Sequence, residues 1–234
     1  MVEELLFYRD IDIACFQEIK VVDEKFPQFP PFQCLVHGQK QYNGVAICSR
    51  LPIGKYQLGF EGEKGESRFI YAQIDKFHII NVYAPLGDQY GERFQYKMEF
   101  YQKLEEFIES RFDLNHDYVV LCGDLNIAHR EIDVWDPNEW EGKVTFLPEE
   151  RKELDRLLGM GFIDVVRAAT SKPIFTFYDY RGGAVYKNHG LRLDYVLISK
   201  PLLSKTKSIE LLLNVRKRRE PKPSDHVPLI VAFE

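Results

Sequence analysis

Two acidic residues directly follow apolar runs of the sequence, and two more stand where apolar runs begin. Glu18 comes after Ile-Ala-Cys-Phe-Gln and Asp124 after Val-Val-Leu-Cys-Gly, whereas Asp194 and Asp225 precede strand-like runs. In an antiparallel pair the end of one strand lies beside the start of its neighbour. We therefore expect all four carboxylates to share one edge of a sheet.

Carboxylates gathered in this way repel one another unless a cation lies among them. Oxygen ligands without clustered Cys or His indicate Mg²⁺, with Mn²⁺ as a substitute. Asn126, two residues after Asp124, adds an amide on the same side. Taken singly, each acid is more readily explained by a solvated strand end or a turn cap. The combination of all four favours a metal site.

His226 adjoins Asp225 and follows a basic run at 216–222. A histidine held by a carboxylate can act as a general base near neutral pH, or can present its charged form to a phosphate. Asp194 is the expected partner that orients its ring. A single histidine is more often a packed or exposed side chain, and a basic run is more often a solvated loop. Net charge is −5, so attraction for phosphate has to come from such a local patch.

The pattern of apolar residues predicts many short strands and two longer helices. Few helices and no regular strand–helix alternation indicate a mostly antiparallel α+β fold. No linker or repeat divides residues 1–234, so we expect a single domain. The expected strands are Ile11–Phe16, Val45–Ser49, Phe69–Ile74, His78–Tyr83, Tyr118–Cys122, Leu193–Ser199, Ile209–Val215 and Leu229–Phe233; a hairpin turn is expected at Asp75-Lys76, helices at Arg93–Arg111 and from Pro148 to Gly159 or Gly161, and a functional loop at Asn126–Phe146.

Composition excludes several other classes of protein. No apolar run approaches the ~20 residues that span a bilayer, and the first residues show an amphipathic helix pattern rather than a signal segment. We therefore expect a soluble, cytoplasmic protein. The four cysteines lie in apolar strand-like runs without any CxxC pair, so we expect buried, reduced thiols and no structural zinc. They are Cys15, Cys34, Cys48 and Cys122.

Several segments, in order over nearly the whole chain, resemble the exonuclease III family of AP endonucleases, within the endonuclease/exonuclease/phosphatase superfamily. Gly-Asp-x-Asn and Ser-Asp-His occur widely in that superfamily, whereas Asn126–Asp133 and Tyr178–Tyr195 are more specific to its DNA-repair branch. The matching segments are Phe16–Lys20, Tyr42–Ile47, Asn81–Pro85, Gly123–Ala128, Glu131–Val134, Phe146–Arg151, Thr176–Arg181, Gly190–Tyr195 and Pro223–His226.

The resemblance implies a DNase I-like, four-layered α/β-sandwich, in which two mostly antiparallel sheets pack face to face with helices outside. It implies a monomeric, Mg²⁺-dependent hydrolase of base excision repair. Such an enzyme incises double-stranded DNA 5′ to abasic sites and trims damaged 3′ ends by 3′→5′ exonuclease activity. Two alternatives remain open: a phosphatase or lipid phosphodiesterase of the same superfamily, and a catalytically impaired form that binds abasic DNA.

The resemblance also assigns roles to individual residues. Glu18 matches the principal Mg²⁺ ligand and Asp225 a further metal-site acid, with Asp124 and Asn126 beside them. Either Asp124 or His226 serves as the base, and Asp124 is favoured. The residues around the scissile phosphate are Tyr83, Asp124, Asn126, Asp194 and His226.

The same resemblance implies two kinds of DNA contact. An apolar pocket selects an extruded abasic sugar because a base does not fit there. Ordinary strand packing is the alternative for all three of its residues, and for Leu193 the two interpretations are equally supported. Basic side chains would contact backbone phosphates without reading sequence. The pocket residues are Phe177, Leu191 and Leu193, and the basic residues are Arg181, Lys187, Arg192 and the run containing Arg216, Lys217 and Arg218.

The match departs from the family pattern at two places. The family opens with a strand bearing a Trp-Asn-Val-Asn-Gly type motif, whereas Met1–Arg9 resembles the helix that follows it. The chain is therefore expected to lack that strand and its metal-site Asn. Leu86 stands where the family has Asn or Gln after Tyr-x-Pro, a position expected to touch a phosphate oxygen.

Overall fold

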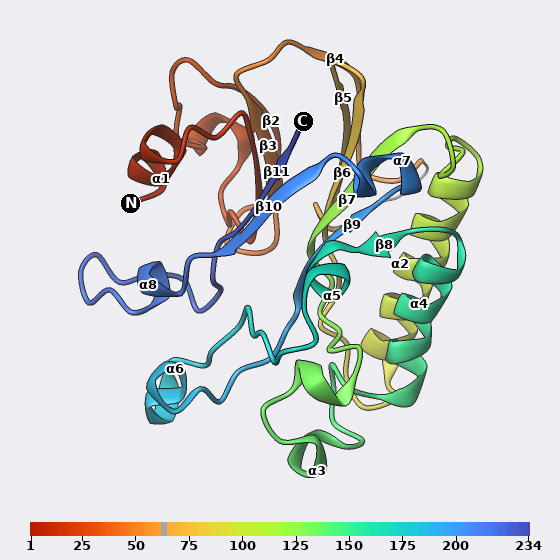
Figure 1. Cartoon of the computed structure of the whole chain (residues 1–234), viewed down its shortest axis with the longest axis vertical. Coiled ribbons are helices and arrows are strands. Elements are labelled where there is room, and N and C mark those ends of the chain that lie inside the picture. Colours follow the sequence, from red (N-terminus) through yellow and green to blue (C-terminus); the bar gives the residue numbers. More distant parts are fainter. Residues whose placement is uncertain (62–64) are drawn as a thin grey trace. The chain divides into compact units, whose positions relative to one another are not determined.

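The structure is a computed structural model of residues 1–234, of which it describes 1–61 and 65–234. Its elements form a mixed α/β fold with several sheets and helices (Figure 1). The chain divides into two compact units. Unit 1 comprises Met1–Tyr83 and Asp117–Asp124, and unit 2 comprises Ala84–His116 and Leu125–Glu234.

Unit 1 contains a short helix and two sheets. The first sheet is antiparallel with the order β1-β3-β2, and the second has the order β4-β5-β6-β7, in which only β6 and β7 run parallel. The elements are α1 (Val2–Tyr8), β1 (Ile13–Gln17), the 3₁₀ turn η1 (Asp23–Lys25), β2 (Gln33–His37), β3 (Val45–Ser49), β4 (Ile53–Leu58), β5 (Phe69–Ile74), β6 (Phe77–Tyr83) and β7 (Tyr118–Asp124).

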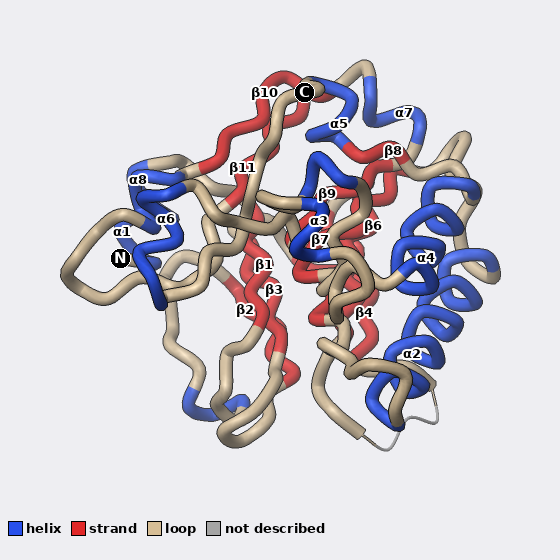
Figure 2. The backbone as a smooth tube through the Cα atoms, turned by 90° about the horizontal axis from the view of Figure 1, so that it is seen from below, coloured by secondary structure: helices blue, strands red, loops and turns tan. Residues whose placement is uncertain are grey.

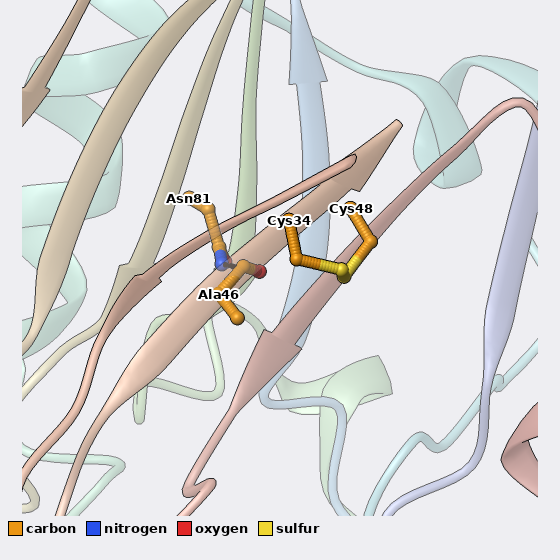
Figure 3. The surroundings of a disulfide bond; sticks show 4 residues. All are labelled: Cys34, Ala46, Cys48 and Asn81. Atoms are coloured by element: carbon orange, nitrogen blue, oxygen red, sulfur yellow. Dashed lines mark hydrogen bonds between the residues drawn. A yellow bond between two sulfur atoms is a disulfide. The ribbon is translucent and has the colours of Figure 1, made fainter. Parts of the chain in front are cut away.

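The two sheets of unit 1 pack against each other through β1 and β3 on one side and β5, β6 and β7 on the other, and one buried amide crosses between them. Asn81 in β6 has no exposed surface. Its Nδ2 donates to the carbonyl oxygen of Ala46 (2.9 Å; Figure 3) and to that of Phe16 (3.0 Å). Its Oδ1 accepts from Gln17 (2.6 Å). Because a buried polar group is costly unless it is hydrogen-bonded, this amide favours one alignment of β6 against β1 and β3.

The sequence-based expectation of four reduced thiols is wrong for Cys34 and Cys48, which form a disulfide (Figure 3). The two residues are direct partners in the antiparallel register of β2 and β3, with Cα atoms 4.0 Å apart. Cys15 and Cys122 are free thiols. A hydrogen bond to Cys122 and burial raise the pKa of the Cys15 thiol, which makes it a poor nucleophile.

Unit 2 contains two long helices, several short ones and two pairs of antiparallel strands, β8 with β9 and β10 with β11. Helices α2 and α4 lie side by side (Figures 1 and 2). The elements are α2 (Glu92–Glu109), η2 (Glu131–Asp133), α3 (Pro137–Trp140), α4 (Pro148–Gly159), β8 (Ile163–Asp164), α5 (Val165–Ala169), η3 (Arg181–Gly183), α6 (Ala184–Lys187), β9 (Asp194–Ile198), α7 (Lys200–Leu203), β10 (Thr206–Leu211), α8 (Leu213–Arg216) and β11 (Leu229–Phe233).

Most of the predicted elements are confirmed to within two residues, including both long helices and the turn at Asp75-Lys76. Helix α2 buries apolar side chains at helical spacing, among them Phe94, Tyr101 and Leu104. The run Ile209–Val215 was predicted wrongly as one strand: β10 ends at Leu211, and a short helix follows it. Strands β2, β4 and β8 were not predicted. No helix of the described part of the chain is long and apolar enough to cross a membrane.

Because one pair of cysteines is bonded, we expect only two free thiols in the unreduced protein. Denatured, unreduced protein treated with iodoacetamide should take up two carbamidomethyl groups, on Cys15 and Cys122, because Cys34 and Cys48 are bonded to each other. After reduction it should take up four. Intact-mass spectrometry of protein kept free of reductant checks this count. Four groups without prior reduction would contradict the bonded pair.

A pair of glutamates between α2 and α4 predicts a pH-dependent stability. Burial and the charge of Glu153 raise the pKa of Glu105 to about 7, above its unfolded value of ~4.3. The folded state therefore binds this proton more tightly, and stability falls as pH rises from about 4.3 to about 7. Glu105→Gln removes that loss, which we expect to be about 1 kcal/mol after allowing for solvent screening.

The measurement is thermal unfolding at pH 5 and pH 8. Glu105→Gln should raise Tm by ~2–4 °C at pH 8 and by much less at pH 5. Glu99→Gln, an exposed site on the same helix, should shift Tm equally at both values. An equal effect of Glu105→Gln at the two pH values would show that Glu105 does not titrate as described.

Candidate active site

In unit 1 three of the predicted site residues lie at the carboxyl ends of strands, one in the first sheet and two in the second. Glu18 follows β1, Tyr83 ends β6 and Asp124 ends β7. Tyr83 and Asp124 are direct partners in the parallel register of β6 and β7. The Tyr83 hydroxyl donates a hydrogen bond to Oε1 of Glu18. Two carboxylates thus flank one phenol, and the convergence of all four acids at one edge stays a prediction.

Backbone geometry holds these strand ends in place. Glu18 adopts a left-handed conformation with φ 53°, which is uncommon for a residue other than glycine and is found at functional sites. Gly123, just before Asp124, has φ 126°. A Cβ atom there would collide with the carbonyl oxygen of Val82 in β6. Only glycine therefore lets β7 lie this close to β6 at the position that sets the direction of Asp124.

The electrostatics of this group keep the phenol protonated. Burial, the hydrogen bond to Glu18 and the negative charges of Glu18 and Asp124 raise the pKa of Tyr83 well above its ordinary value, against an opposing effect of Arg68. The Arg68 guanidinium lies 4.7 Å from the Tyr83 ring centroid and donates to the Tyr83 carbonyl (3.1 Å). The Lys20 ammonium lies 2.9 Å from Oε2 of Glu18. Tyr83 is therefore a hydrogen-bond donor at any physiological pH.

In unit 2 the expected pairing of His226 with Asp194 is present, with Nδ1 2.8 Å from Oδ2. Thr176, which the sequence reasoning did not single out, holds both segments. Its Oγ1 accepts hydrogen bonds from the backbone N–H groups of Leu193 (3.0 Å) and Asp194 (2.9 Å), and its carbonyl accepts from Val227 (2.6 Å). The only sequence signal was its place directly before Phe177 in a matching segment.

Asn126 lies beside the Asp194 segment. The N–H of Leu125 donates to the carbonyl of Leu193 (2.9 Å), so the residues that precede Asn126 and Asp194 are bonded to each other. Asn126 has a left-handed backbone, φ 50°, and its Nδ2 donates to the carbonyl of Ala84 (2.8 Å). Its placement is therefore fixed through both its backbone and its side chain.

Asp225 and Phe177 are two further predicted site residues in unit 2, next to Tyr178 and His226. The Asp225 carbonyl accepts from the N–H of Tyr178 (2.9 Å), and its carboxylate is partly exposed. The Phe177 ring meets the His226 ring edge to face, with centroids 5.2 Å apart. Leu191 and Leu193, expected to share a sugar pocket with Phe177, are only 3% and 4% exposed in an apolar cluster. For these two leucines the structure shows core packing, the alternative interpretation.

The predicted phosphate contact of Arg192 is wrong. Its side chain is fully buried and pairs with Asp133 (2.6 Å) and Asp164 (2.7 Å), and Arg167 also binds Asp133 (2.5 Å). Burial by itself would raise the pKa of Asp133, but the hydrogen bonds and charge of Arg192, followed by those of Arg167, lower it. Arg192 neutralises two interior carboxylates, and this role keeps it away from solvent.

Of the other basic residues predicted to contact DNA, one is buried and four are exposed or partly exposed. Arg216 is 7% exposed, donates to the Tyr178 carbonyl (2.8 Å) and lies 4.9 Å from the Tyr180 ring centroid, so its predicted phosphate contact is also wrong. Its charge is used to join two loops of unit 2. Four predicted DNA-binding residues keep exposed or partly exposed side chains. These are Arg181, which pairs with Asp179 (2.8 Å), Lys187, Lys217 and Arg218.

The carboxylates of unit 1 suit a divalent cation. Glu18 and Asp124 offer the hard oxygen atoms that Mg²⁺ prefers. Within 1–61 and 65–234, no three or more His, Cys, Asp or Glu side chains form a group that could hold a metal ion. Mg²⁺ keeps several waters and is usually bound through one or two carboxylates plus phosphate oxygens. The residues therefore fit an ion completed by solvent and substrate, rather than a closed protein cage.

Residues 1–226 match the model of the endonuclease/exonuclease/phosphatase family. Exodeoxyribonuclease III of Haemophilus influenzae is 32% identical over 243 residues, which cover 95% of this chain and 90% of that protein. The exodeoxyribonuclease of Bacillus subtilis is 30% identical over 228 residues, covering 94% and 87%.

An AP endonuclease structure from Archaeoglobus fulgidus is similar with a TM-score of 0.95 and 34% identity, covering 100% of this chain and 93% of that one. A 3′ phosphatase structure from Neisseria, bound to a product DNA hairpin, gives a TM-score of 0.94 with the same coverage. These similarities confirm the expected fold. Because the family model spans nearly the whole sequence and the relatives match over most of their length, the chain belongs to the endonuclease/exonuclease/phosphatase family, in its exodeoxyribonuclease III and AP endonuclease branch.

Proposed function

We propose that this protein is a divalent-metal-dependent DNA phosphodiesterase that incises DNA 5′ to abasic sites and trims 3′ ends. The observation that carries the proposal is the phenol of Tyr83 flanked by the carboxylates of Glu18 and Asp124. The names of the relatives support the same reaction class. We further propose that it acts as a monomer in the cytoplasm on double-stranded DNA.

Glu18 is proposed as the principal ligand of Mg²⁺, or of Mn²⁺ in its place, with Asp225 as a further acid of the metal site. When bound, the ion would offset the charge of the phosphate and stabilise the departing 3′-oxygen. Glu18 suits this role because its carboxylate is partly exposed at a strand end. The Tyr83 hydroxyl bonded to Oε1 fixes the direction of that carboxylate.

Asp124 is proposed to orient a water molecule and to take its proton as the water oxygen bonds to phosphorus and the P–O3′ bond breaks. Its position at the end of β7 beside Tyr83 supports this role. Asn126 and His226 would donate hydrogen bonds to the non-bridging oxygens as charge grows there. Tyr83 has a single proton, which it donates to Glu18 in this structure, and it would join them by turning that proton from Glu18 to the phosphate. Asp194 holds the His226 ring through Nδ1, so the donated hydrogen bond would come from Nε2 of the imidazolium form, in which both ring nitrogens carry a proton.

For binding, the exposed basic side chains of unit 2 are proposed to contact backbone phosphates. The edge of the Phe177 ring beside His226 would contact the extruded sugar, with Leu191 and Leu193 supporting it from the core. A compact apolar surface suits an abasic sugar, since extrusion costs least where no base pair has to be broken. The phosphate-contacting residues are Arg181, Lys187, Lys217 and Arg218.

Removing the proposed base should abolish incision. Asp124→Asn should lower kcat on a duplex with one tetrahydrofuran abasic analogue by ~10²–10⁴-fold, the range for loss of a general base. Chelation by EDTA should stop the wild-type reaction, and added Mg²⁺ should restore it. Gel analysis of a labelled strand measures both effects.

Asp12→Asn, at an exposed acid close to β1, serves as the control and should incise at the wild-type rate. An inositol phosphate and a sphingomyelin substrate should not be hydrolysed. Full incision in EDTA, full activity of Asp124→Asn, or turnover of the lipid-type substrates in place of abasic DNA would each refute the proposal.

The exposed lysine at 217 predicts a change in the salt dependence of DNA binding. Each phosphate contact contributes ~0.9 to the slope of log K against log salt concentration on duplex DNA. Lys217→Ala should therefore lower that slope by about one and leave kcat unchanged. Fluorescence anisotropy with Asp124→Asn as the background, at 25–200 mM salt, measures the slope without incision.

Lys152→Ala is the matched control, because Lys152 is an exposed lysine on α4 outside the proposed binding residues. It should leave the slope unchanged. If Lys217→Ala and Lys152→Ala behave alike, Lys217 does not contact phosphate.

A further inference from the structure

Next to Asn126, unit 2 contains a fully buried ammonium group that the proposed reaction does not use. The Lys97 side chain, in α2, has no exposed surface, and neither has its partner Glu150, in α4. Its Nζ lies 2.7 Å from Oε1 of Glu150, 2.7 Å from the carbonyl oxygen of Asn126 and 3.2 Å from that of Leu86. The three N–H donors of a lysine thus have three acceptors in reach.

This arrangement satisfies the requirements for a buried charge. Glu150 supplies the opposite charge, and its second oxygen accepts from the N–H of Leu147 (3.1 Å) at the start of α4. Even so, burying two ions costs desolvation energy that their attraction repays only in part, and an apolar pair of similar volume is often as stable. Stability alone therefore does not explain why Lys97 and Glu150 occupy this position.

The ammonium binds the carbonyl of Asn126 itself and that of Leu86. Both carbonyls belong to segments that set the orientation of the Asn126 side chain. Asn126 has a left-handed backbone, and its side-chain amide reaches back to the Ala84 carbonyl (2.8 Å) in the segment that contains Leu86. Lys97 therefore binds both segments that this hydrogen bond joins, one through the Asn126 carbonyl and the other through the Leu86 carbonyl. Gly87 packs directly against the Lys97–Glu150 pair. A Cβ at this position would lie 3.1 Å from Cδ of Lys97 and 3.5 Å from Oε1 of Glu150.

We infer that Lys97 is a positioning residue for phosphodiester hydrolysis: its buried ammonium holds the Asn126 and Leu86 carbonyls, and so aims the Asn126 amide at the phosphate. This inference rests on the proposed function of Asn126. Glu150 has a different part, since it neutralises the ammonium but contacts neither carbonyl in the hydrogen bonds described above. The two members of the pair should therefore differ in their effect on catalysis.

The test compares Lys97→Met/Glu150→Gln with the wild type on the abasic duplex. The double variant removes both charges and keeps similar shapes, so Tm should stay within a few degrees of the wild-type value. Its kcat should fall 10- to 100-fold while KM changes less than threefold. Glu150→Gln alone keeps the amine and its bonds to the carbonyls, so its kcat should stay within threefold even if Tm falls. Lys103→Met, at a partly exposed lysine of the same helix, should change neither.

Two outcomes would overturn the inference. One is a kcat of the double variant within twofold of the wild type. The other is an equal loss of kcat in Glu150→Gln, which would mean that any disturbance of the pair acts through general instability. Asn126→Ala separates this result from the proposed function. If Asn126→Ala is fully active, the role of Asn126 itself is wrong. If it is inactive while the double variant is fully active, only the role of Lys97 is lost.

Discussion

Carboxylates can be held close together or inside a protein only where donors or positive charges offset their charge, and this constraint shapes both units of the molecule. In unit 1 the Tyr83 hydroxyl offsets Glu18. In unit 2 His226 offsets Asp194, and Arg192 offsets two interior acids. The acids assigned to chemistry are the ones left partly exposed or at strand ends, where a cation or a phosphate can reach them. The interior acids Asp133 and Asp164 are neutralised by arginine and support the fold.

Buried polar side chains hold the backbone segments that carry the site residues. Asn81 ties the end of β1, just before Glu18, to β6, just before Tyr83. Thr176 joins the segment that leads into Asp194 to the one that follows His226. Each of these groups would cost free energy if its partners moved away, because it would then be buried without a hydrogen bond. The site geometry is therefore coupled to the packing of the strands that carry it.

The positions of the strand-end acids could be predicted from the sequence because they depend on local patterns. An apolar run of strand length followed by an acid places Glu18 and Asp124 without any knowledge of tertiary contacts. Strand β4 was missed because most of its residues are exposed and it lacks an apolar run. The Cys34–Cys48 bond depends on the register of two strands, which their sequences do not specify.

The basic residues show the limit of reasoning from charge. Arg192 and Arg181 are both arginines in matching segments, yet one is fully buried against acids and the other is exposed. What distinguishes them is a pairing with Asp133, 59 positions away in the sequence. Burial of a charged side chain depends on such distant partners, so the sequence could not show which arginines remain available for DNA.

The claim on which the account depends is that carboxylates at strand ends hold a divalent ion for chemistry on a phosphate. Electron paramagnetic resonance of free Mn²⁺ measures how tightly the protein binds the ion, and so tests this claim without any DNA or turnover. Wild-type protein should bind Mn²⁺, and Glu18→Gln should bind it at least ~10-fold more weakly, since even partners outside the ligand shell contribute that much. Equal Mn²⁺ affinity in the two proteins would contradict the account.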